Sequence, residues 1–111
     1  DEDIYEIIEY FASRNKILYV HFRNVSAPNP NEFNEEFINT GYVDMVKAMK
    51  IYKDAGYGGC FMDDHCPDIY NDQEFPGNLG GYRSRIFAQG YIQGLLDSIK
   101  WEWLRLIFLR G

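Results

Sequence analysis

The segment Gly58-Gly59-Cys60-Phe61-Met62-Asp63-Asp64-His65-Cys66-Pro67 reads as a short strand followed at once by two carboxylates, an imidazole and a proline. An apolar run such as Gly59–Met62, bounded by glycines and polar residues, predicts a strand of a parallel sheet that is covered on both faces. In folds of alternating strands and helices, the residues just past the carboxyl end of a strand face the ligand. We therefore expect Asp64 and His65 to lie at a functional site.

Asp64 and His65 supply a carboxylate oxygen and an imidazole nitrogen. Both groups are good ligands for a divalent metal, and both can move protons near neutral pH. The structural alternative is that Asp63 or Asp64 caps the next helix and that His65 is a surface loop residue. The pair alone does not decide between the two.

A second polar cluster follows another predicted strand. Ile17–Arg23 is dense in apolar and β-branched residues, which predicts a second buried strand. His21 lies at its end, and Arg23 and Asn24 come next. Polar residues at the carboxyl ends of two parallel strands meet at one edge of the sheet. The coincidence strengthens the functional interpretation of both clusters.

Three helices are predicted from apolar residues at helical spacing. The first covers Ile4–Phe11, with Asp1 and Asp3 at its N-terminal end, and ends at Ser13–Asn15. The second runs from Val43 to a glycine stop at Ala55-Gly56, and the third from about Tyr82 to Lys100. Their predicted apolar faces are Ile4, Ile7, Ile8 and Phe11; Met45, Ala48, Met49 and Tyr52; and Ile92, Leu95, Leu96 and Ile99.

Two connections are less regular. Glu32–Thr40 is either a short helix or an irregular excursion over the site. Asp68–Gly81 is a polar loop that is long enough to be a lid or a binding loop.

Helix, strand, helix, strand, helix is the order of an α/β protein with a parallel sheet. A chain of 111 residues makes one modest domain at most. Two parallel strands do not make a self-sufficient sheet, because both edges stay open to pairing. Residues 1–111 are therefore predicted to be a single partial domain, a piece of a larger α/β barrel.

The composition excludes several classes of protein. A net charge of -6 without a basic run argues against a nucleic-acid binder. No apolar run is long enough to cross a membrane, and the acidic first residues are unlike a signal peptide, so a cytoplasmic location is expected. Cys60 and Cys66 are candidate metal ligands or plain buried thiols, since two cysteines at this spacing do not indicate a disulfide-stapled fold.

Several stretches, in the same order along the chain, resemble mannonate dehydratases, which are metal-dependent sugar-acid lyases with a TIM barrel of the xylose isomerase type. The most specific pair is Val-His-Phe-Arg-Asn-Val followed downstream by Asp-His-Cys-Pro. The stretches are Ile4–Phe11, Val20–Val25, Glu35–Ile38, Gly41–Met45, Asp64–Pro67 and Gly90–Leu95. The resemblance implies that the chain forms the C-terminal βα units, about the last third, of a TIM (β/α)8 barrel.

The resemblance also implies roles for residues of the two polar clusters. It makes His21 and Asp64 ligands of Mn²⁺ or another divalent metal such as Fe²⁺. It makes His65 a catalytic acid or base, and Arg23 and Asn24 substrate-binding residues, with the Arg23 fork suited to a planar carboxylate. The implied reaction is the dehydration of D-mannonate to 2-keto-3-deoxy-D-gluconate in hexuronate breakdown.

A catalytic tyrosine is expected before the last helix, with Tyr82 as the candidate and Tyr70 as the alternative. The chain also departs from the family pattern. The family's two further metal ligands, a histidine and a cysteine, have no counterpart here, and Asn39-Thr40-Gly41 stands where the family has Asp-Glu-Gly. The chain alone is therefore expected to be inactive.

Two other functions stay open. One is a metal-dependent sugar isomerase or epimerase of the same superfamily. The other is a non-catalytic fragment that associates with copies of itself through open sheet edges and an apolar tail. For the dehydratase we expect a small-molecule sugar-acid substrate and a homo-oligomer.

Overall fold

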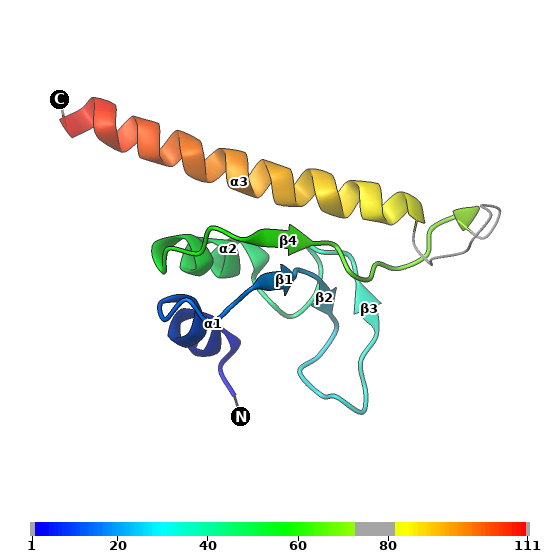
Figure 1. The fold of residues 1–111 in the computed structure, drawn as a ribbon. Helices are drawn as coiled ribbons and strands as arrows, with labels where there is room; N and C mark the ends of the chain where they lie inside the picture. Colours follow the sequence, from blue (N-terminus) through cyan, green and yellow to red (C-terminus); the bar gives the residue numbers. More distant parts are fainter. Residues whose placement is uncertain (1, 73–81, 111) are drawn as a thin grey trace.

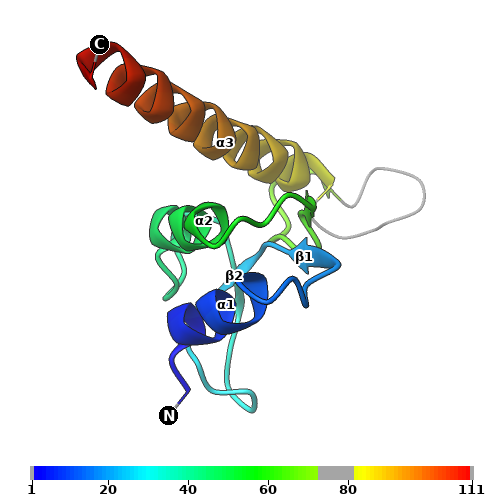
Figure 2. The same cartoon turned by 60° about the vertical axis from the view of Figure 1, so that its left-hand side comes forward.

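The computed structural model describes residues 2–72 and 82–110, and for residues 82 and 101–110 it describes the backbone alone. The elements in chain order are α1 (Ile4–Ala12), β1 (Tyr19–His21), β2 (Asn24–Val25), β3 (Glu35–Glu36), α2 (Met45–Asp54), β4 (Cys60–Met62) and α3 (Tyr82–Arg110). Figure 1 shows α3 as a long rod that lies along α2 and β4. Helix α2 lies between α1 and α3 and contacts both, as Figure 2 also shows.

Strands β1 and β4 pair in parallel, as predicted. The register places Tyr19 opposite Cys60 and His21 opposite Met62. The pairing extends one residue further, because Phe22 N donates to Met62 O over 2.7 Å. The carboxyl ends of both strands therefore lie side by side.

Strands β2 and β3 form a small antiparallel sheet, with Asn24 opposite Glu36 and Val25 opposite Glu35. This pair takes up part of the segment over residues 32–40, which was expected to be a short helix or an irregular excursion. This pairing brings Glu35–Glu36 next to Asn24–Val25, the residues that follow β1.

One core holds the helices to one face of the β1–β4 sheet. Rings from strands and helix make a cluster in which the Phe22 and Phe61 centroids lie 5.3 Å apart and those of Tyr52 and Phe61 lie 5.3 Å apart. The buried apolar residues are Ile8, Ala12, Val20, Phe22, Ile38, Met45, Ala48, Met49, Tyr52, Ala88, Ile92 and Ile99.

The prediction that β1 and β4 are covered on both faces is wrong for the described part of the chain. Tyr19 is 57% exposed and Met62 42% exposed, and Cys60 is exposed as well. Side chains alternate between the two faces of a strand, and the helices cover only the face that carries Val20 and Phe61. The other face, which carries Tyr19, His21, Cys60 and Met62, is open; we call it the open face.

Helix α1 begins at Ile4, as the sequence predicts, whereas α2 begins at Met45, two residues after the predicted Val43. The Asp3 carboxylate accepts from Tyr5 N over 2.8 Å, and the Asp44 carboxylate accepts from Lys47 N over 2.9 Å. Both contacts satisfy N–H groups that have no partner inside the helix. Helix α2 ends at Asp54, and Gly56, two residues later, adopts φ +83°, a conformation that suits glycine.

The apolar faces of these two helices are predicted unequally well. All four predicted residues of α2 are buried. In α1 the buried stripe is centred on Ile8 and Ala12, whereas Phe11 is 45% exposed. The stripe is therefore rotated by one position from the predicted one.

Helix α3 continues past the predicted end at Lys100 to Arg110. The segment from Trp101 to Arg110 contains no glycine or proline, and Leu, Glu and Arg within it favour helix. Among residues 2–72 and 82–110, no helix combines the length and apolarity that are needed to cross a bilayer.

Candidate functional site

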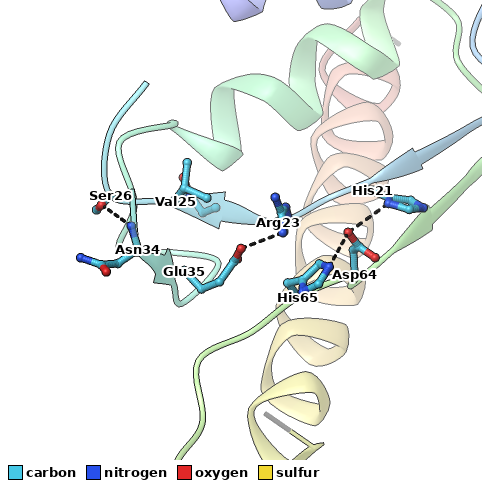
Figure 3. A network of polar contacts seen from close by, with 9 residues as sticks. His21, Arg23, Val25, Ser26, Asn34, Glu35, Asp64 and His65 are labelled. Carbon is cyan, nitrogen blue, oxygen red and sulfur yellow. Dashed lines mark hydrogen bonds and ion pairs between the residues drawn. The ribbon is translucent and has the colours of Figure 1, made fainter. Parts of the chain in front are cut away.

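Three of the predicted site residues lie together: the imidazoles of His21 and His65 both contact the carboxylate of Asp64. Asp64 Oδ2 lies 3.1 Å from His21 Nδ1 and 3.3 Å from His65 Nε2 (Figure 3). The side chains of His21 and His65 are 44% and 58% exposed, and that of Asp64 is 24% exposed. The cluster is therefore open to a ligand.

The register of the parallel pair explains this meeting. His21 lies opposite Met62, and Asp64 follows Met62 by two residues, which returns its side chain to the open face. Neither histidine nor carboxylate caps a described helix. The alternative that Asp63 or Asp64 caps a helix is therefore not borne out for the described helices, whereas its other part is, because His65 lies in an exposed loop.

Asp63 has a different partner on the opposite side. Its carboxylate is 5% exposed and accepts from Arg85 Nε and from Gln89 Nε2, both at 3.1 Å. Arg85 and Gln89 are four residues apart and so share a face of α3. Sequence reasoning missed this anchor, although the i, i+4 spacing of two donors near the start of a helix was a signal for it.

The first turn of α3 also holds the chain beyond His65. Ser84 Oγ donates to Pro67 O. Asp72, 2% exposed, accepts from Ile69 N over 2.9 Å and from Arg83 N over 3.2 Å. The start of α3 therefore bonds to the chain at Asp63, Pro67 and Asp72, and so holds in place the segment that contains Asp64 and His65.

Arg23 and Asn24 have different surroundings. Arg23 Nη1 donates to Glu35 Oε1 over 2.7 Å, and its side chain is 30% exposed. Asn24 is 1% exposed, and its amide donates to Ile38 O and Val43 O and accepts from Val25 N and Val43 N. The geometry gives Asn24 a structural role, because its hydrogen-bonding capacity is used by backbone groups and does not reach the site.

The chain was compared with known proteins. The family described as D-mannonate dehydratase (UxuA) matches residues 1–104. The chain belongs to the mannonate dehydratase family.

Individual members of the mannonate dehydratase family agree with this assignment. The mannonate dehydratase of Brachyspira hyodysenteriae is 33% identical over 100 residues, which are 88% of this chain and 27% of that protein. Mannonate dehydratase 2 of Halalkalibacterium halodurans is 29% identical over 99 residues, 87% of this chain and 28% of that protein. The crystal structure of mannonate dehydratase from Streptococcus suis serotype 2 superposes with a TM-score of 0.74 at 31% identity, over 86% of this chain and 28% of that one.

These matches confirm the predicted family and the mixed α/β fold with parallel strands and helices. The chain spans less than a third of the length of the relatives it matches. That it corresponds to the C-terminal units of a TIM barrel stays a prediction.

Among the described residues, the candidate ligands for a metal ion would form only part of a complete set. Two ligands on one ion at about 2.1 Å each, at right angles, lie about 3.0 Å apart. The 3.1 Å between His21 Nδ1 and Asp64 Oδ2 fits that separation. Within the described ranges, no group of three or more His, Cys, Asp or Glu side chains is arranged to hold an ion. His21 and Asp64 therefore fit part of a metal site.

The cysteines do not extend this donor set. Cys60 is exposed on β4, and Cys66 is half-buried. Burial raises the pKa of the Cys66 thiol, and the Asp63 carboxylate raises it further, against a lowering by Arg85 and by a hydrogen bond with Ser84. A raised pKa keeps the thiol protonated at neutral pH and so unfavourable as a ligand.

The predicted catalytic tyrosine is only partly located. Tyr82 is the first residue of α3, and its side chain lies outside what the structure describes. The alternative, Tyr70, is 86% exposed, and its carbonyl oxygen accepts from Arg83 Nη1 over 3.0 Å. Of the predicted loop, residues 73–81 lie outside the described residues.

Proposed function

We propose that this chain supplies part of the active site of a mannonate dehydratase, which removes water from D-mannonate and leaves 2-keto-3-deoxy-D-gluconate. The observation that carries the proposal is the contact of His21 and His65 with one oxygen of Asp64, at the carboxyl ends of two adjacent parallel strands. The names of the relatives support the choice of substrate.

In this proposal residues 1–111 are a single partial domain, the C-terminal third of a TIM barrel. Support comes from the two-stranded parallel sheet, whose outer edges have no partner strand within the described residues. Further support comes from the open face of β1 and β4, which inward-facing side chains would occupy in a closed barrel.

His21 and Asp64 would hold a divalent metal, Mn²⁺ or Fe²⁺, through imidazole nitrogen and carboxylate oxygen. When bound, such an ion stabilises negative charge that develops on substrate oxygens. The further ligands that a complete site needs would come from residues outside the described part of the chain or from water.

His65 is proposed as a proton carrier. Loss of water from a hydroxy acid removes one proton from the carbon beside the carboxylate and delivers one to the departing hydroxyl. His65 has its imidazole at the edge of the cluster, 58% exposed and oriented by Asp64, so it can serve one of these transfers. Tyr82 is the proposed partner for the other transfer.

Arg23 is proposed to bind the substrate carboxylate. It follows His21 by two residues, and Phe22 between them is buried, so alternation places Arg23 on the side of His21. A guanidinium can pair with a planar carboxylate through two parallel hydrogen bonds. The contact would orient the sugar acid against the Asp64 cluster.

The test measures product from D-mannonate in a complete barrel that contains this chain, with and without a chelator. A keto-acid product that disappears on metal removal supports the dehydratase. A product of unchanged composition would identify a sugar isomerase or epimerase instead, and turnover that survives complete metal removal would contradict the proposal. The 111-residue chain alone is expected to give no turnover.

We also propose that copies of the chain associate. Large apolar side chains are exposed: Leu18, just before β1, is 89% exposed, and Ile86, on α3, is 64% exposed. Open parallel edges and exposed apolar groups both favour association. A monomer in sedimentation velocity at micromolar concentration would contradict this proposal and leave the dehydratase proposal untouched.

A further inference from the structure

Arg23 is held by a carboxylate to which no role has been assigned. The contact from Arg23 Nη1 to Glu35 Oε1 is 2.7 Å long, which is at the short end for a charge-assisted hydrogen bond, and both side chains are largely buried, 30% and 27% exposed. The second oxygen, Glu35 Oε2, is buried without a hydrogen-bond partner. A carboxylate that leaves one buried oxygen unsatisfied is costly, so its position calls for an explanation.

The backbone that carries Glu35 is fixed on several sides. Strand β3 pairs with β2, where Glu35 lies opposite Val25. The loop between the strands is closed by Ser26 N donating to Asn34 O over 3.0 Å and by Asn34 N donating to Ser26 Oγ over 2.9 Å (Figure 3). Glu35 therefore follows directly after a closed loop and has little freedom to move away from Arg23.

Asn24 fixes the same unit from the other side. Its buried amide ties the start of β2 to Ile38 and Val43, three and eight residues beyond Glu35. Gly41 is needed for this tie, because a Cβ there would overlap the Asn24 amide. The residue before Arg23 is fixed as well, since Phe22 N bonds Met62 O on β4. Both partners of the ion pair thus stand on rigid backbone.

We propose that Glu35 is a positioning residue that holds the Arg23 guanidinium toward the carboxylate of a sugar acid bound at the Asp64 cluster. The inference rests on the proposed function, since it assigns the substrate carboxylate to Arg23. Because Glu35 engages Nη1, the Nε and Nη2 donors remain for two parallel hydrogen bonds to a ligand. A long, rotatable side chain that is already ordered loses less conformational entropy when the ligand binds.

A competing role for Glu35 predicts the opposite effect on sugar-acid binding. Glu35 also neutralises part of the Arg23 charge and could simply compete with an anionic ligand. If Glu35 only competes, its removal strengthens sugar-acid binding. If Glu35 positions Arg23, its removal frees the guanidinium and weakens binding.

The experiment uses the complete barrel that contains this chain and nitrogen-15 NMR of the arginine side chains, with the Arg23 signal assigned by its absence in Arg23→Lys. Glu35→Gln keeps the shape and removes the charge, and Glu35→Asp keeps the charge on a shorter side chain. Glu36→Gln is the matched control, because Glu36 is the adjacent carboxylate and accepts from Thr40 rather than from Arg23. Thermal unfolding of each variant verifies that it is folded.

Two quantities are measured, the rate of rotation of the Arg23 guanidinium and the shift of its signal on titration with D-mannonate. We expect slow rotation in the wild type and in Glu36→Gln, faster rotation in Glu35→Gln, and about tenfold weaker D-mannonate binding in Glu35→Gln. Glu35→Asp should recover part of both effects.

The outcomes separate the inference from the proposed function. Binding of equal or greater strength in Glu35→Gln overturns the inference and leaves the proposed function standing. Rotation that is equally slow in Glu35→Gln also overturns it. If Glu35 orders Arg23 but D-mannonate leaves the Arg23 signal of the wild type unchanged, the positioning of the side chain holds, and the assignment of Arg23 to the substrate carboxylate is contradicted.

Discussion

Asp63 and Asp64 are neighbours in the chain, yet their carboxylates lie in opposite surroundings. Asp63 is buried against Arg85 and Gln89 of α3, whereas Asp64 faces His21 and His65 beside the open face. Alternation along an extended chain produces this division. One carboxylate anchors the strand end to the helix behind it, and the other is left for chemistry.

The anchor can be tested by Asp63→Asn. The substitution removes the negative charge that faces Arg85 in a largely buried pair, and we expect the free energy of unfolding to fall by about 1–3 kcal/mol. Urea unfolding followed by circular dichroism measures the change. Glu9→Gln on the exposed side of α1 is the control and should stay within about 0.5 kcal/mol. An Asp63→Asn variant as stable as the control would show that the pair with α3 contributes nothing.

Two glycines should respond to alanine in opposite directions. At Gly41 a Cβ would overlap the Asn24 amide and lie 2.7 Å from Val25 O, so Gly41→Ala should destabilise the chain by about 1–3 kcal/mol. At Gly90, in the middle of α3, a Cβ meets nothing within 4 Å, so Gly90→Ala should stabilise the chain by up to about 1 kcal/mol. Melting temperatures of the two variants check both signs, and a stable Gly41→Ala would remove the argument for the Asn24 tie.

Alkaline pH should weaken the fold through Tyr52. Burial raises the pKa of the Tyr52 phenol above its ordinary value of 10.0, and the nearby Tyr57 raises it further. Below about pH 10 the phenol is neutral in both the folded and the unfolded chain, so it adds no pH dependence. Above that pH the unfolded chain loses the proton first, and stability falls until the folded-state pKa is passed.

The measurement for this prediction is the melting temperature between pH 8 and pH 11. Tyr52→Phe should fall less steeply than the wild type over the alkaline part of the range. Tyr70→Phe is the matched control, because Tyr70 is 86% exposed, and it should follow the wild type. Parallel curves for Tyr52→Phe and the wild type would contradict the assignment.

The proposed roles of Asp64 and His65 predict that substituting Asp64 lowers both the metal content and the rate, whereas substituting His65 lowers the rate alone. In a complete barrel, Asp64→Asn should lose both bound metal and turnover of D-mannonate, because it removes a charged ligand. His65→Gln should keep its metal and lose about 10²–10⁴-fold in kcat, the range of a missing proton carrier. Metal analysis alongside kinetics separates the two, and a His65→Gln variant with normal kcat would remove His65 from the proposed chemistry.

Much of the site follows from local patterns. The helical spacing of Met45, Ala48, Met49 and Tyr52 predicted a face that is buried throughout. Strand signals before His21 and Asp64, together with the alternation of helix and strand, predicted a parallel pair whose ends meet. These predictions hold because residue spacing along a helix or strand determines which side chains share a face.

Other parts depend on partners that are distant in the chain. The ion pair of Arg23 with Glu35 spans 12 residues, and that of Asp63 with Arg85 spans 22. Nothing in the spacing of single residues pairs them, because the contact exists only once β2 has paired with β3 and α3 has packed behind β4. The structural role of Asn24 could not be predicted for the same reason, since its four hydrogen bonds join it to Val25, Ile38 and Val43, and the last two are distant in the chain.

The sequence by itself determined the family, the alternation of three helices with two parallel strands, and the presence of His21, Asp64 and His65 at strand ends. Only the tertiary structure decided that Asp64 is the carboxylate shared by both histidines, that Asp63 is an anchor, and that Arg23 is held by Glu35. The physical reason is that periodicity along the chain reports which face a residue occupies, whereas the identity of its partner depends on register and packing between segments.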